Sequence, residues 1–98
     1  MKRAKASDFP ELRRFFAGYL HEDFVVEHGT PAAALRAFVA DANASERQRL
    51  RDEAKRFLAL MKDMEFDDAV ARVDKLGSRW VPESRAELVR LFERMGKS

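Results

Sequence analysis

One short segment of the chain carries side chains that could bind a metal ion or exchange protons. His21, Glu22, Asp23 and His28 place two imidazoles and two carboxylates close together in the sequence. A zinc site needs ligands that converge, and ligands on one helix are usually three or four residues apart. The two histidines are separated by seven positions across a predicted loop, and the spacing specifies no third ligand. We therefore predict no metal site, and we interpret the segment as a polar junction whose side chains cap helix ends.

Nucleophilic catalysis has little support in the sequence. The chain has no cysteine, and each of its five serines and its one threonine has a structural explanation. Thr30, Ser45 and Ser84 are predicted helix N-caps, and the other serines precede the first helix or lie in a linker or the tail. The four glycines occur singly, so no glycine-rich phosphate-binding loop is present. The sequence predicts no catalytic residue, no cofactor and no enzymatic activity.

Two acidic segments and two aromatic residues are candidates for contact with a protein partner. Residues 21–30 and residues 62–68 each carry a net charge of −3. Charge complementarity selects partners and speeds association, and Tyr and Trp often dominate interfaces. Two alternatives stay open: the acidic runs are solvated surface, and the tryptophan closes the base of the helical bundle. The candidate residues are Glu22, Asp23, Glu27, Asp63, Glu65, Asp67, Asp68, Tyr19 and Trp80.

Cations on the predicted third helix make nucleic-acid binding an alternative hypothesis. Arg47, Arg49, Arg51, Lys55 and Arg56 lie on this helix, but three acidic residues are interleaved among them. A solvated face with ion pairs at i, i+4 accounts for such a pattern. The formal net charge of the chain is only +2, whereas nucleic-acid binders usually carry a strongly basic surface. A small helical nucleic-acid-binding regulator is therefore the second hypothesis, and a structural adaptor is the third.

The elements that position these side chains are all predicted to be helices. The first helix is expected to start with a capping box of Asp8 and Glu11, with Pro10 in its first turn. Residues 21–29 should form a loop or a short extended piece that ends at Gly29. The first helix has apolar residues at i, i+3, i+4, i+7 and i+8, namely Leu12, Phe15, Phe16, Tyr19 and Leu20.

Four more capping signals and one glycine divide the rest of the chain. Thr30 and Pro31 start the second helix, which ends near residues 41–43. Ser45 and Gln48 are expected to cap the third, and Asp63 the fourth, which stops at Gly77. After a linker over residues 78–83, a box of Ser84 and Glu87 opens the fifth. The residues expected to face the core in these helices are Ala34, Leu35, Phe38, Val39, Leu50, Ala54, Phe57, Leu58, Met61, Phe66, Val70, Val73, Leu76, Leu88, Leu91, Phe92 and Met95.

The predicted fold class is all-α, an irregular bundle of about five helices. At 98 residues, with 46% hydrophobic and 37% charged residues, residues 1–98 are expected to form one domain with a modest core. Residues 1–7 are expected to be a flexible basic N-terminus, and they are not a secretory signal because they lack its apolar stretch. No apolar run approaches the roughly 20 residues that a membrane span needs. We therefore expect a cytoplasmic protein with no membrane contact.

The stretch Phe9-Pro-Glu-Leu-Arg-Arg-Phe-Phe-Ala-Gly-Tyr-Leu-His-Glu-Asp-Phe24, followed by Glu27-His-Gly-Thr-Pro31, resembles a known family. It is similar to the opening of small α-helical immunity proteins of bacterial contact-dependent growth inhibition (CDI) systems. Members of that family typically have a "pELrqff-gYfhqDw" segment and then a "yGtpeeAl" helix start. Phe24 occupies a position where the family often has Trp, and His28 one where it often has an aromatic residue. The matching positions are Pro10, Glu11, Leu12, Phe15, Phe16, Gly18, Tyr19, His21, Asp23, Gly29, Thr30 and Pro31.

The resemblance implies a protein that binds and neutralises a cognate toxin domain and so protects the cell that makes it. Toxins of these systems are frequently nucleases, often acting on tRNA, and form the variable end of a large secreted protein. A nuclease binds its polyanionic substrate through a basic cleft, which the acidic candidate residues could occupy. The net charge of +2 argues against wholesale mimicry of nucleic acid. The shared motif is expected to encode the scaffold, and nothing in the sequence specifies the oligomeric state.

Overall fold

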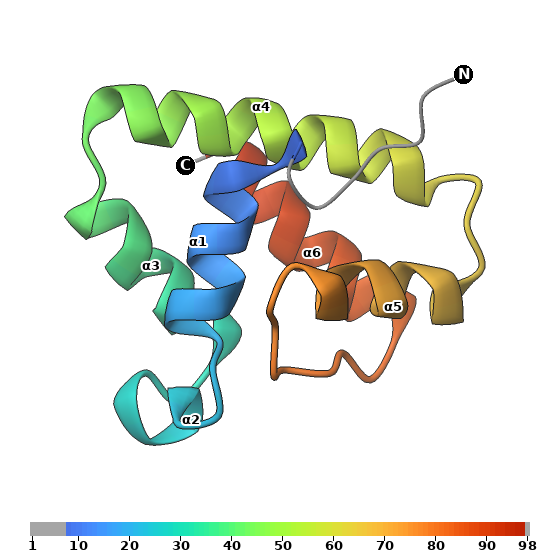
Figure 1. The fold of residues 1–98 in the computed structure, drawn as a ribbon, viewed down its shortest axis with the longest axis horizontal. Coiled ribbons are helices and arrows are strands. Elements are labelled where there is room, and N and C mark those ends of the chain that lie inside the picture. The colour runs from blue at the N-terminus through green and yellow to red at the C-terminus, as the bar shows by residue number, and fades with distance from the viewer. Residues whose placement is uncertain (1–7, 98) are drawn as a thin grey trace.

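The computed structural model describes residues 8–97, and the predicted flexible N-terminus over residues 1–7 lies outside them. Over this range the chain forms six helices and no strand, which confirms the all-α prediction (Figure 1). The number of helices differs from the expected five because the segment predicted as a loop contains a short helix. The helices are α1 Pro10–Tyr19, α2 Phe24–Glu27, α3 Pro31–Asp41, α4 Ala44–Met61, α5 Phe66–Lys75 and α6 Arg85–Gly96.

The long helix α4 runs along one edge of the molecule and packs against α1 and α6 (Figure 1). Helix α3 flanks α1 and α6, so these four helices enclose the core. Aromatic rings join them: Phe92 of α6 stacks on Phe57 of α4 at 4.7 Å between centroids and lies 5.9 Å from Phe16 of α1. Phe15 of α1 meets Phe38 of α3 edge to face at 5.7 Å. The apolar stripe predicted for the first helix is therefore the centre of the core.

Two of the predicted helix starts are confirmed. Thr30 is the N-cap of α3, and its hydroxyl accepts a hydrogen bond from the Ala33 N–H at 3.1 Å. Ser84 caps α6 in the same way through the Glu87 N–H at 3.2 Å. The return bond of that capping box is shifted by one residue, since the Glu87 carboxylate accepts from the Glu83 N–H.

Two other predicted caps are each wrong by two residues. The capping box of α4 is formed by Asn43 and Glu46 rather than by Ser45 and Gln48. Helix α5 starts after Glu65, whose side chain makes no cap hydrogen bond, so Asp63 is not its N-cap. Asn43 and Ser45 near the start of α4, like Asp63 near the start of α5, are all residue types that favour the N-cap position. The backbone conformation that selects one of them is set by the preceding turn, which the sequence pattern does not reveal.

The predicted capping box of α1 is also wrong. The N-cap of this helix is Phe9, which has no hydrogen-bonding side chain, and Glu11 is buried. The Glu11 carboxylate faces Arg14 and Arg49 instead of turning back to the start of its own helix. The first-turn N–H groups are satisfied from another helix, as described below.

Helix α5 presents a narrower inner face than predicted. Ala69, Val73 and Leu76 are buried, whereas Phe66 and Val70 are only half-buried. Gly77 ends the helix with φ +100°, a left-handed conformation that favours glycine at this position. The helix therefore stops where the sequence predicts. No helix within residues 8–97 is long and apolar enough to span a membrane.

Candidate functional site

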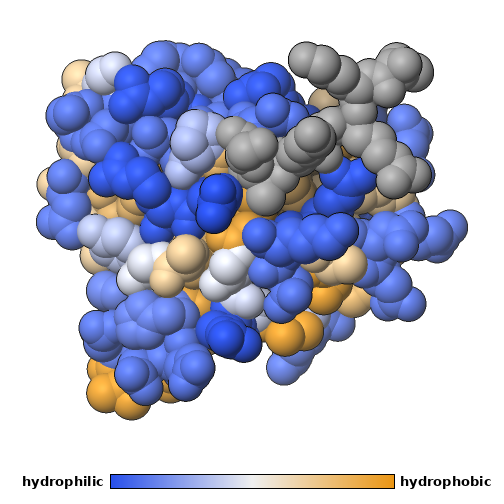
Figure 2. Space-filling model, viewed as in Figure 1, coloured by the Kyte–Doolittle hydropathy of each residue, from blue (hydrophilic) through white to orange (hydrophobic). Residues whose placement is uncertain are grey.

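The acidic residues nearest the start of the chain lie on a protruding corner between α1 and α3. We call residues 21–29, which include α2, the α2 corner. Glu22, Asp23 and Glu27 are all exposed on it. Val25 and Val26 are also exposed, at 61% and 88%. Figure 2 shows the apolar surface at the tip of this corner with hydrophilic surface beside it. The sequence pattern did not identify the two valines as surface residues.

Hydrogen bonds within the α2 corner fix its shape. The Asp23 N–H donates to Nδ1 of His21 at 3.1 Å, and Nε2 of His21 lies 2.6 Å from a Glu27 carboxylate oxygen. The imidazole therefore bridges the two ends of α2. Gly29 ends the corner with φ +84°. His21 acts as the polar junction that the sequence predicts, and its partner is a carboxylate of the same corner.

Tyr19 anchors this corner to the rest of the molecule. Its hydroxyl donates to Asp41 at 2.6 Å, which ties the end of α1 to the end of α3. Its ring stacks on His28 at 5.8 Å and meets Phe38 edge to face at 5.2 Å. The hydrogen bond to Asp41, reinforced by burial, raises the pKa of the Tyr19 hydroxyl. The predicted interface residue is thus half-buried and has a structural role in the described fold.

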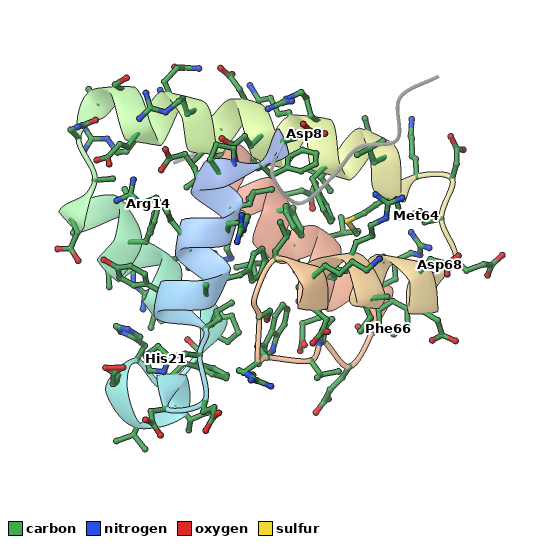
Figure 3. All side chains as sticks on the ribbon, viewed as in Figure 1. Asp8, Arg14, His21, Met64, Phe66 and Asp68 are labelled. Carbon is green, nitrogen blue, oxygen red and sulfur yellow. The ribbon has the colours of Figure 1, made fainter. Side chains whose placement is uncertain are left out.

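The second acidic segment lies at a different corner. Asp63, Glu65, Asp67 and Asp68 are exposed around the turn between α4 and α5. Figure 3 places Asp68 far across the view from His21, so the two acidic segments do not form one continuous patch. A guanidinium from α6 stabilises this turn by donating hydrogen bonds to two backbone carbonyls where α4 ends and the turn begins.

That guanidinium belongs to Arg85. It donates to the carbonyl oxygen of Met61 at 3.0 Å and to that of Met64. Met61 is the last residue of α4, where carbonyl groups have no partner within the helix, and Met64 lies in the turn that follows. The sequence did not predict this contact, because it joins positions more than twenty residues apart.

Trp80 lies in the linker between α5 and α6 and is half-buried against the core. The Ser78 hydroxyl bonds both its backbone N–H at 3.1 Å and its carbonyl oxygen at 2.9 Å. The indole borders a shallow hollow of about 290 Å³ with Pro31 and Leu91. This packing of Trp80 against the core agrees with the alternative to an interface role, in which the tryptophan closes the base of the helical bundle.

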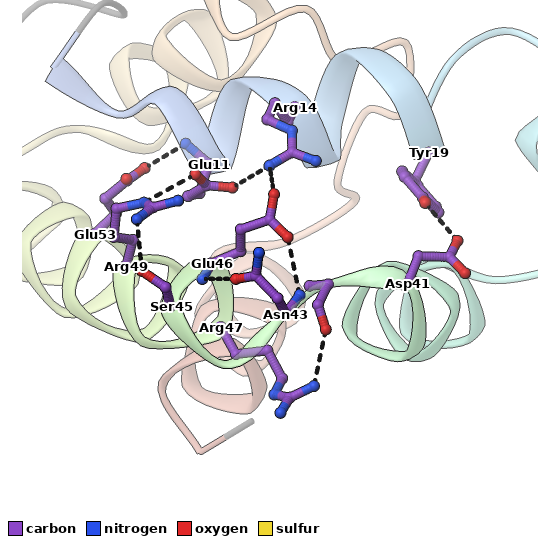
Figure 4. Close-up of polar contacts among 11 residues, drawn as sticks. Glu11, Arg14, Tyr19, Asp41, Asn43, Ser45, Glu46, Arg47, Arg49 and Glu53 are labelled. Atoms are coloured by element: carbon purple, nitrogen blue, oxygen red, sulfur yellow. Dashed lines mark hydrogen bonds and ion pairs between the residues drawn. The ribbon is translucent and has the colours of Figure 1, made fainter.

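A polar network that includes a buried carboxylate lies between α1 and α4 (Figure 4). Oε1 of Glu53 accepts from the backbone N–H groups of Glu11 and Leu12 at 2.9 and 3.0 Å. Glu53 is only 3% exposed, and burial raises the pKa of its carboxyl while the two hydrogen bonds oppose that rise. This residue was expected on the solvated face of its helix. Glu53 lies three residues after Leu50 and four before Phe57, and this helical spacing indicates that it faces the core with them.

The same network includes arginines of α4 on which the hypothesis of nucleic-acid binding was based. Arg49 lies 3.2 Å from the Glu11 carboxylate and donates to the Ser45 hydroxyl at 2.8 Å. Arg47 donates to the Ala42 carbonyl at 2.8 Å. These contacts hold the start of α4 against its neighbours, which gives two of its five cations a structural function.

Metal-binding side chains do not gather anywhere in the range that the structure covers. Within residues 8–97, no three His, Asp or Glu side chains are placed to hold one ion. His21 is paired with Glu27, and His28 is stacked on Tyr19.

Comparison with known proteins gives one match. Residues 8–94 match the family model described as CdiI immunity protein. Neither a curated protein nor a solved structure matches the chain. The matched range includes all six helices except the last residues of α6.

Proposed function

The chain belongs to the CdiI immunity protein family, and we propose that it neutralises a cognate toxin by covering the active site or the substrate cleft of that toxin. The partner would be the C-terminal domain of a CDI protein, and the complex would form in the cytoplasm. The observation that carries the proposal is the family match over residues 8–94. This function needs an interface and no catalytic group.

We propose further that the toxin is a nuclease, and the family resemblance favours tRNA as its substrate. A nuclease must attract a polyanion and therefore presents a basic cleft. Exposed carboxylates at the α2 corner and at the turn between α4 and α5 are complementary to such a cleft. An interface of standard size buries roughly 800 Å² on each partner. The chain exposes 6163 Å² in total, so one of these corners with its surroundings would suffice.

Co-expression tests the immunity function directly. The gene upstream of this one should encode a very long secreted protein, whose C-terminal domain is the toxin to be tested. Cells that express this domain should grow only when the present chain is co-expressed, and the two proteins should purify together. An unrelated CDI toxin domain is the control, since the chain should not protect against it. If the cognate domain kills the cells regardless, the proposed function is wrong.

The nuclease hypothesis has a separate test. Purified toxin domain should degrade tRNA, and an equimolar amount of the chain should leave the tRNA intact. A toxin with a different activity, neutralised all the same, would remove the nuclease hypothesis and leave the immunity function standing. Salt-dependent binding of the isolated chain to RNA or DNA would instead support the regulator hypothesis.

A further inference from the structure

The most exposed large apolar side chain in the part of the chain that the structure describes lies on an acidic protrusion. Val26 is 88% exposed, and Val25 beside it is 61% exposed, whereas Val81, at 67%, is a lone exposed valine in the linker between α5 and α6. Val25 and Val26 belong to α2, and the carboxylates of Glu22, Asp23 and Glu27 surround them in the sequence. A lone exposed valine needs no explanation, but two adjacent ones at the tip of a protruding corner mark a candidate contact surface.

The protrusion is held in one shape by its own hydrogen bonds. The His28 N–H donates to the Phe24 carbonyl at 2.7 Å, and the Gly29 N–H donates to the Val25 carbonyl at 3.0 Å. Phe24, on the inner side of the same turn, packs against the core. The valines therefore face outward from a supported backbone. Rigid contact residues lose less conformational entropy on binding, which favours affinity.

The charge around the valines indicates the kind of partner. Residues 21–30 carry a net charge of −3, and the three carboxylates flank an apolar tip. A complementary surface has an apolar depression at its centre and cations around it. A cleft built to bind nucleic acid supplies the cations, since it must neutralise phosphates. Apolar contact at the centre with charged residues at the rim is the usual arrangement of a specific interface.

We propose that Val26, supported by Val25, is the apolar anchor that seats the α2 corner in the basic cleft of the cognate toxin domain. Glu22, Asp23 and Glu27 meet cations around the anchor. This inference rests on the proposed function and names the part of the surface that performs it. The acidic turn between α4 and α5 lies outside this contact, since it occupies a different corner of the molecule.

Binding of the purified toxin domain to matched variants tests the anchor. In Val26→Ser the dissociation constant should rise on the order of 10- to 100-fold, the loss expected when a buried valine contact is removed. The control is Leu60→Ser, at the far end of α4 from the α2 corner, where the side chain is 36% exposed (Figure 1). It should change the dissociation constant less than threefold. Circular dichroism melting curves should show that both variants fold.

Charge reversal tests the rim separately. Glu22 and Asp23 changed together to Lys, with Glu27 kept because its carboxylate contacts His21, should slow association at least tenfold at low salt, and the difference should shrink as salt rises. Reversal of Asp63 and Glu65, an equal change in charge, should have a much smaller effect.

The results of these binding experiments distinguish a failure of the anchor inference from a failure of the proposed immunity function. If wild type neutralises the toxin and Val26→Ser binds as tightly as wild type, the anchor inference is wrong while the immunity function stands. An equal loss in both valine and leucine variants would also overturn it. If wild type does not bind the toxin domain, the proposed function itself is wrong.

Discussion

Removal of the Glu53 side chain should destabilise the protein far more than its position on a charged helix suggests. Its Oε1 atom accepts both the Glu11 and the Leu12 N–H groups, so this residue of α4 caps the start of α1. The N-cap residue of α1, Phe9, supplies no side-chain acceptor. In Glu53→Ala these two N–H groups would be buried without a partner.

The size of the effect follows from these two hydrogen bonds. A buried donor left without a partner costs about 1–3 kcal/mol, and loss of a helix cap typically costs about 1 kcal/mol. Water that enters the space left by the carboxylate would accept hydrogen bonds from these N–H groups in part. We therefore expect the free energy of unfolding to fall by roughly 2–4 kcal/mol. A domain of this size is stable by about 5–15 kcal/mol, so the melting temperature should fall by roughly 10–20 °C.

Glu53→Gln separates hydrogen bonding from charge. The amide oxygen can accept both N–H groups, so this variant should stay within about 1 kcal/mol of wild type at neutral pH. Burial raises the pKa of the Glu53 carboxyl, which means that the folded state binds its proton more tightly than the unfolded state. That contribution is fully present below the unfolded-state pKa and is lost as the pH rises through the folded-state pKa. The stability of wild type relative to Glu53→Gln should therefore fall as the pH rises above about 4.

Urea denaturation followed by circular dichroism at several pH values measures these differences. Asp52→Ala is the control, since this neighbouring carboxylate is exposed and, among residues 8–97, accepts a hydrogen bond only from Gln48 on its own helix. It should change the free energy of unfolding by less than about 0.5 kcal/mol. If Glu53→Gln were as destabilising as Glu53→Ala, the charge rather than the hydrogen bonding would be essential. A loss below about 0.5 kcal/mol in Glu53→Ala would refute the capping role altogether.

Four further predictions concern the scaffold. Gly77→Ala should cost about 2–3 kcal/mol in urea denaturation, because φ is +100° there and a Cβ would lie 2.8 Å from one on α1. Gly18→Ala, where a Cβ meets nothing within 4 Å, should instead stabilise the protein by about 0.5–1 kcal/mol. Tyr19→Phe should lower the free energy of unfolding by about 0.5–1.5 kcal/mol, since it loses a hydrogen bond to α3. The pKa of Glu46 is lowered, first by the hydrogen bond from the Asn43 N–H and then by a guanidinium. Its stabilising effect is present above the unfolded-state pKa and is lost as the pH falls, so Glu46→Gln should flatten the acid side of a stability–pH profile.

The sequence predicted those parts of the fold that depend on neighbouring residues. Thr30 and Ser84 cap helices because a hydroxyl precedes an apolar run, and Gly77 ends one because it can adopt positive φ. Contacts between distant residues were not predictable in this way. Glu53 caps a helix more than forty positions away, and Arg85 donates to the Met61 carbonyl at the end of α4.

The candidate site was predictable in chemistry but not in shape. The acids of the α2 corner are exposed, as a charged run usually is. The single turn of α2 is too short to give a periodic pattern, so its helix was missed. Phe24, Val25 and Val26 form one apolar run in the sequence, yet the first packs against the core and the other two face outward. Only the tertiary arrangement separates a core residue from a surface one within such a run.

The residues that carry the resemblance to the family have structural roles in this fold. Glu11 pairs with cations between α1 and α4, Tyr19 ties α1 to α3, and Thr30 caps α3. Such contacts can serve any member that shares the scaffold, whatever toxin it binds. Val25 and Val26 lie between the two segments that carry the resemblance, and they are exposed. A scaffold that holds a corner rigidly while leaving its tip free to vary would allow one fold to recognise different toxins. Exchange of the tip residues between two family members should therefore alter which toxin is neutralised without altering the melting temperature.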